Sequence, residues 1–113
     1  MKLTKLIKNA HLSIFASKLE DFTVRGVTCN SKSVKRGYVF IAIKGNRLDG
    51  TKFIDEARSA GAGAVISPSA GKGINFIRVK DTRKAAAKLG AEFYGNPSAQ
   101  RLTYTLNETN QTN

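Results

Sequence analysis

The chain has few of the residues that catalytic and metal sites usually need. Its 113 residues include one cysteine, Cys29, one histidine, His11, and no tryptophan. A lone cysteine cannot form an internal disulfide, which agrees with a reducing compartment, and one cysteine with one histidine excludes a zinc site of these residue types. No nucleophile stands at a spacing from His11 that is typical of catalysis. We therefore predict no catalytic residue and no metal ligand in this chain.

Long apolar segments are missing as well. No run approaches the roughly 18 apolar residues of a membrane-spanning helix. Lys2, Lys5 and Lys8 precede an apolar stretch at residues 12–16, but this stretch is shorter than the roughly 7–15 residues of a secretory signal core. We expect a cytoplasmic protein with no membrane partner, and the length is that of one domain with a modest core.

Acidic residues are scarce relative to basic ones. The chain has 8 Asp and Glu against 19 Lys and Arg, a net charge of +11. Such an excess is typical of nucleic-acid-binding proteins, so a basic nucleic-acid-binding module is an alternative interpretation. The basic residues are spread along the whole chain, however, and no aromatic residue is evidently interleaved with them as a stacking platform. A solvated lysine-rich surface is the favoured explanation, and nucleic acid is not the expected partner.

Strand-like and helical patterns alternate along the chain. Strands are predicted at residues 22–28, 38–43, 62–67, 74–79 and 102–106, and helices at residues 3–10, 51–60 and 81–93. Thr51 and Asp81 are predicted helix caps, and Gly95 is a predicted helix end. Residues 38–43 are almost wholly apolar, which predicts a strand buried on both faces. The alternation predicts an α/β fold, with a mixed or mostly parallel sheet and flanking helices.

Two of the predicted strands end in polar loops. Residues 29–33 follow the first strand and residues 44–50 follow the second. Both loops are expected at the same edge of the sheet, which is a common place for a small-molecule site. On local grounds Ser31, Asn46 and Arg47 are equally well explained as turn formers and as ligand-binding residues.

Three sequence motifs resemble one family. VTCNSK at residues 27–32 and VKRGYVFIA at residues 34–42 are similar to the T-x-D-S-R-x-V-x-x-G-D-L-F-V-A pattern in the N-terminal domain of the Mur ligases. KGNRLDGTKFIDEA at residues 44–57 is similar to the x-G-x-x-x-D-G-H-x-F-I-x-x-A pattern of the same domain. FYGNPS at residues 93–98 is similar to F-Y-x-x-P-S, which favours the UDP-N-acetylmuramyl-tripeptide synthetase branch. The resemblance covers residues 22–110.

The resemblance implies a role in peptidoglycan synthesis, and with it in cell shape and cell division. In this family the N-terminal domain holds the uridine end of its substrate, so residues 1–106 are expected to bind UDP-N-acetylmuramyl-dipeptide. By motif position the substrate-binding residues are Cys29, Ser31, Asn46, Arg47 and Leu48. Uracil offers a donor–acceptor edge that backbone groups near Cys29 and the Ser31 hydroxyl can read. A guanidinium such as that of Arg47 matches the oxygens of a diphosphate.

The chain departs from the family pattern in the first loop. Asn30 and Lys32 stand where the family has aspartate and arginine. The loss of a carboxylate and of a planar guanidinium weakens any ion pair that would brace this loop.

The polar tail at residues 107–113 departs further. It reads NETNQTN where the family has the ATP-binding loop T-G-T-N-G-K-T. Glu108 and Gln111 replace the two glycines, and Thr112 replaces the lysine, so this tail cannot wrap and neutralise phosphates. We expect no cofactor in this chain, whereas the resemblance implies ATP and magnesium for a full-length relative. The central ATPase domain and the C-terminal domain are also expected to be absent, so the chain alone is not expected to catalyse ligation.

Three explanations of the unusual tail stay open. The chain is a truncated or decayed gene product, a fragment with an altered tail, or a stand-alone binding module. A truncated remnant that no longer binds substrate is the second alternative interpretation of function.

Overall fold

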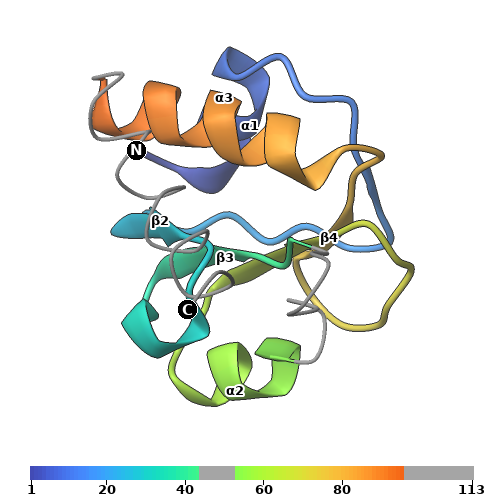
Figure 1. Ribbon diagram of the computed structural model, residues 1–113. Helices are drawn as coiled ribbons and strands as arrows, with labels where there is room; N and C mark the ends of the chain where they lie inside the picture. The colour runs from blue at the N-terminus through green and yellow to red at the C-terminus, as the bar shows by residue number, and fades with distance from the viewer. Residues whose placement is uncertain (44–52, 96–113) are drawn as a thin grey trace.

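The computed structural model describes residues 1–43 and 53–95 (Figure 1). Its elements in chain order are α1 Leu3–Asn9, β1 Phe15–Ala16, β2 Gly26–Thr28, the 3-10 helix η1 Ser31–Ser33, β3 Tyr38–Ile41, α2 Ile54–Ser59, β4 Ala64–Ser67, β5 Phe76–Arg78 and α3 Thr82–Tyr94. The strands form one five-stranded sheet in the order β1-β5-β4-β3-β2.

The sheet is mixed. Strands β2, β3, β4 and β5 run parallel to one another, and Val39 of β3 lies between Val27 of β2 and Ala64 of β4. Strand β1 pairs antiparallel with β5 through Phe15 and Arg78. The α/β class and the mixed, mostly parallel sheet predicted from the sequence are confirmed.

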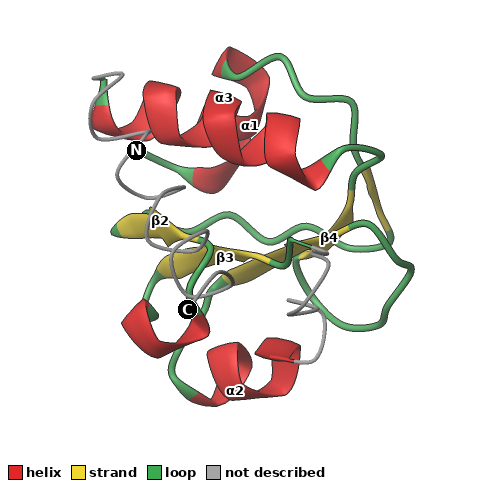
Figure 2. Cartoon of the chain, in the orientation of Figure 1, coloured by secondary structure: helices red, strands yellow, loops and turns green. Residues whose placement is uncertain are grey.

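Helices cover both faces of the sheet, with α1 and α3 on one face and α2 on the other (Figure 2). Val39 and Ile41 contribute to the core under α1 and α3, whereas Phe40 and Ala42 contribute to the core under α2. Successive side chains of a strand point to opposite faces, so all four are buried. This explains why residues 38–43 are apolar throughout.

The ends of α3 follow the sequence prediction. The backbone N–H of Lys84 donates to Asp81 Oδ1 at 3.0 Å, so Asp81 caps the first turn. Gly95 has a φ of 65°, in the left-handed region, and its N–H bonds the Ala91 carbonyl. Helix α2 begins after Phe53 without a side-chain cap, and the predicted cap Thr51 lies outside the described residues.

Several predicted elements are shorter than expected, and one was missed. The strand predicted over 22–28 is regular only at Gly26–Thr28, because Thr23 forms a single bridge with Lys2 instead. Strand β1 was not predicted, since its two residues carry no periodic pattern and are defined by their pairing with β5. The predicted strand at 102–106 lies outside the described residues.

No helix in the described ranges has the length and apolar character required to cross a membrane.

Candidate functional site

The carboxyl ends of the four parallel strands lie at one edge of the sheet. Ligands in open α/β sheets bind outside this edge, because the loops that leave the strands gather there. Residues 29–33 leave β2 at this edge, next to the end of β3, from which the chain runs toward residue 44. Cys29 and Ser31 therefore occupy the position that the sequence predicted. Asn46, Arg47 and Leu48 lie outside the described residues.

The loop after β2 is ordered by its own side chains. The N–H of Asn30 donates to Thr28 Oγ1 at 3.1 Å. Asn30 Oδ1 in turn accepts from the N–H of Lys32 at 3.0 Å and caps η1. An asparagine and an aspartate offer the same capping oxygen, so Asn30 supplies this acceptor although the family pattern has aspartate here.

Ser31 is held by a residue that the sequence analysis did not select. Its side chain is buried, and its hydroxyl donates to Glu56 Oε1 at 2.5 Å. Glu56 lies in the first turn of α2, 25 residues further along the chain. Because the Ser31 hydroxyl donates its hydrogen bond to Glu56, the lone pairs of its oxygen are available to accept a hydrogen bond from a ligand.

Cys29 is a core residue. It is 3% exposed and packs in the cluster under α1 and α3. Burial raises the pKa of its thiol to about 12, an effect only partly offset by the charge of Arg83. A thiol with such a pKa stays neutral and is a poor nucleophile, so a contribution of Cys29 to ligand binding has to come from its backbone.

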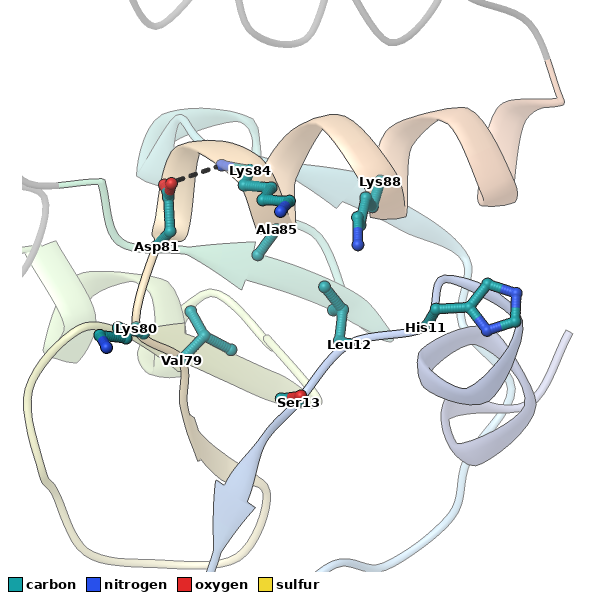
Figure 3. Close-up of a pocket in the computed structure, with 9 residues that line it drawn as sticks. All are labelled: His11, Leu12, Ser13, Val79, Lys80, Asp81, Lys84, Ala85 and Lys88. Carbon is teal, nitrogen blue, oxygen red and sulfur yellow. Dashed lines mark hydrogen bonds between the residues drawn. The ribbon is translucent and has the colours of Figure 1, made fainter.

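A second feature is a hollow of about 280 Å³ between residues 11–13 and α3 (Figure 3). Its lining residues are His11, Leu12, Ser13, Val79, Lys80, Asp81, Lys84, Ala85 and Lys88. Lys84 and Lys88 reach down from α3 toward Leu12 (Figure 3). Within residues 1–43 and 53–95, their ammonium groups form no ion pair. Two aligned ammonium groups favour an anion, but an exposed lysine row on a helix is also an ordinary solvated surface.

This hollow is separate from the loop after β2. It lies at the end of β5, and two strands stand between β5 and β2. Three strand spacings amount to about 14 Å. A single small chemical group of a ligand therefore cannot contact Ser31 and also lie in the hollow.

The described residues offer no metal centre. They contain no group of three or more His, Cys, Asp or Glu side chains placed to hold an ion. Among the described residues, the loop at residues 29–33 offers hydrogen-bonding groups at the edge of the sheet.

Comparison with known proteins agrees with this architecture. Residues 23–94 match the Mur ligase family, catalytic domain. A UDP-N-acetylmuramoyl-L-alanyl-D-glutamate--2,6-diaminopimelate ligase of Aquifex aeolicus (strain VF5) is 48% identical over 89 residues, which cover 77% of this chain and 18% of that protein. The ligase of the same name from Clostridioides difficile (strain 630) is 38% identical over 112 residues, covering 97% of this chain and 23% of that protein.

Solved structures show the same fold. A structure of MurF from Acinetobacter baumannii superposes with a TM-score of 0.64 at 21% identity, over 79% of this chain and 20% of that one. MurF ligase from Thermotoga maritima, solved in complex with ADP, has a TM-score of 0.53 and 42% identity, over 65% of this chain and 17% of that one.

The chain thus spans about a fifth of the length of the relatives that it matches. The names of the two diaminopimelate ligases describe the addition of a third amino acid to a dipeptide precursor, as expected of the tripeptide synthetase branch. The resemblance to the N-terminal domain of this branch is confirmed, and the chain belongs to the Mur ligase family.

Proposed function

We propose that this chain is the substrate-binding domain of a ligase that adds an amino acid to a peptidoglycan precursor, and that it holds UDP-N-acetylmuramyl-dipeptide by the uridine and the diphosphate. The observation that carries the proposal is the buried hydroxyl of Ser31, which Glu56 orients at the carboxyl edge of the parallel sheet.

The chemistry of Ser31 suits a uracil ring. The ring presents an imide N–H between two carbonyl oxygens, so a protein that reads this edge must supply an acceptor flanked by donors. Ser31 supplies the acceptor because its own proton is engaged by Glu56. Backbone groups of Cys29 and its neighbours supply further partners.

The diphosphate is assigned to the second loop. Asn46, Arg47 and Leu48 are the proposed residues, since the loop that contains them follows β3, the neighbour of β2 in the sheet. An arginine fork binds two phosphate oxygens at once, which makes Arg47 the main anchor.

The proposed domain comprises residues 1–106, followed by a polar tail at residues 107–113 that does not bind nucleotide phosphates. Ligation by a full-length relative needs ATP and magnesium, which this chain alone is not proposed to use. The proposed compartment is the cytoplasm, where nucleotide-linked precursors are made, and the proposed process is cell-wall synthesis.

The test is an NMR titration of the labelled 113-residue chain with UDP-N-acetylmuramyl-dipeptide, with UDP as a second ligand. Saturable shifts confined to residues 29–33 and 44–50 are expected with both ligands. Ser31→Ala should weaken binding about tenfold, since a buried hydrogen-bonding partner is lost. Ser33→Ala is the matched control, because Ser33 lies in the same short helix. A folded wild-type protein that shows no shifts would identify a non-binding remnant.

The alternative function, a basic nucleic-acid-binding module, is tested by the same NMR titration with a short DNA duplex. The aligned Lys84 and Lys88 are the observation that favours it. A nucleic-acid-binding module would give shifts along α3 that weaken steeply as salt is raised. We expect no such shifts at physiological salt.

A further inference from the structure

The hydroxyl of Tyr94 bonds the outer side of β2, the last strand of the sheet among residues 1–43 and 53–95. It accepts from the N–H of Val27 at 3.2 Å and donates to the C=O of Val27 at 3.0 Å. The two residues are 67 positions apart in the sequence. One side chain therefore replaces the pair of hydrogen bonds that a neighbouring strand would otherwise make.

The loop at residues 29–33, called the nucleotide loop below because it is proposed to bind uridine, follows this outermost strand directly. In the part of the chain that the structure describes, β2 is the last strand of the sheet, and Val27 is its central residue. Edge strands with unpaired backbone groups are free to twist, slip or pair with other chains. Because Tyr94 binds both polar groups of Val27, it holds the strand in place immediately before the loop begins.

Tyr94 is itself held in position. It is the last residue of α3, and the ring of Phe93 lies 4.8 Å away in an edge-to-face arrangement, with an angle of 89° between the ring planes. Phe93 in turn packs against the main core cluster. The position of the Tyr94 hydroxyl is thus fixed by helix α3, which packs on the sheet, and by the neighbouring ring of Phe93.

Short links lead from Val27 to the ligand-facing loop. Thr28 follows Val27 directly and accepts from Asn30, and Ser31 is fixed by Glu56. The loop is therefore anchored twice, at its start by Tyr94 from α3 and at Ser31 by Glu56 from α2. These two helices lie on opposite faces of the sheet (Figure 1).

We infer that Tyr94 is a positioning residue for the nucleotide loop, and that the last turn of α3 sets how tightly this loop holds a uridine nucleotide. The inference rests on the proposed function. Tyr94 is 39% exposed, so part of its side chain is in contact with solvent. Any segment or partner that shifts the end of α3 changes the affinity of the loop at residues 29–33.

The test compares Tyr94→Phe with two controls. Tyr38→Phe removes a hydroxyl near the same edge, where the Tyr38 ring lies over Gly26, without touching Val27. Ile77→Val weakens the fully buried core far from the loop, so it lowers global stability and leaves the Tyr94 contact intact. Each protein is measured for urea stability, for amide hydrogen exchange, and for affinity toward UDP and UDP-N-acetylmuramyl-dipeptide.

Tyr94→Phe should speed exchange at Val27 and at residues 29–32 and lower both affinities about three- to tenfold, the loss expected for a partly exposed hydrogen-bonded contact. Both controls should stay within about twofold of wild type in affinity, by the same scale. Equal affinities for wild type and Tyr94→Phe, or an equal loss in Ile77→Val, would overturn the inference. If wild type binds neither nucleotide, the proposed function fails. The exchange rates at residues 29–32 then decide separately whether Tyr94 orders the loop, and unchanged rates would overturn that part too.

Discussion

The side chain of Asn75 makes three hydrogen bonds to backbone groups. Its Oδ1 accepts from the N–H of Glu20 at 2.8 Å, and its Nδ2 donates to the carbonyls of Glu20 and Gly63, each at 2.9 Å. Asn75 is 4% exposed and has a φ of 59°. It joins the segment that leads out of β1 to the starts of β4 and β5, so its replacement should weaken the whole sheet.

The expected magnitude follows from these contacts. Each hydrogen bond contributes about 1 kcal/mol net, so the loss of three gives about 3 kcal/mol. An alanine with positive φ adds about 1 kcal/mol of backbone strain that asparagine and glycine tolerate better. We therefore expect Asn75→Ala to lower the free energy of unfolding by about 4 kcal/mol, and Asn75→Gly by about 3 kcal/mol.

Urea denaturation followed by far-ultraviolet circular dichroism measures both values. Asn75→Asp is a useful third variant, because it keeps the acceptor for Glu20 but turns a carboxylate toward two carbonyls. It should be at least as destabilised as Asn75→Ala. A loss below about 1 kcal/mol in Asn75→Ala would refute the role of the three hydrogen bonds. Equal losses in the alanine and glycine variants would refute the part assigned to backbone strain.

Four further predictions concern the site and its surroundings. Glu56→Ala should weaken binding of UDP-N-acetylmuramyl-dipeptide about tenfold in calorimetric titration, whereas Glu56→Gln, which keeps an acceptor for Ser31, should lose less. Asp81→Ala should cost about 1 kcal/mol in urea denaturation, and Asp81→Asn, which can still cap α3, clearly less. Burial raises the pKa of Cys29 from its ordinary value of 9.0 to about 12 in the folded state, so the unfolded chain releases this proton first as the pH rises above 9.0. The contribution of the neutral thiol to the free energy of unfolding is therefore complete below pH 9.0 and is lost as the pH approaches 12. Urea denaturation at a series of alkaline pH values should show this loss in the wild type and not in Cys29→Ala. Lys84→Glu with Lys88→Glu should leave UDP affinity within about twofold, since the hollow lies at the end of β5, about 14 Å across the sheet from β2. A larger change would contradict the separation of the two features.

Features that depend on neighbouring residues were predictable from the sequence. Asp81 and Gly95 act within one turn of α3, through bonds to Lys84 and Ala91. The apolar run at residues 38–43 indicated a strand between two covered faces, and β3 has that position. The strand and turn patterns also placed Ser31 in the loop that follows the first predicted strand, and the structure has it there.

Features that depend on distant pairs were not predictable. Glu56 was not selected from the sequence, whereas its carboxylate accepts a hydrogen bond from Ser31. Tyr94 entered only as part of a motif, and its contact with Val27 spans 67 residues. No periodicity or spacing carries such information, because these pairs form only when α2 and α3 pack on the sheet.

The order of apolar and polar residues along the chain thus specified an α/β domain, because burial on one or both faces of a strand requires a recognisable pattern of side chains. The Mur ligase family was indicated separately, by the resemblance of three sequence motifs. Packing of the two helix layers added what that pattern does not encode. It bonded the Ser31 hydroxyl to the Glu56 carboxylate, placed the Cys29 thiol in the core, and bonded the Tyr94 hydroxyl to the backbone of β2. Each of these outcomes depends on the distance and direction between groups on different elements, which exist only in the folded chain.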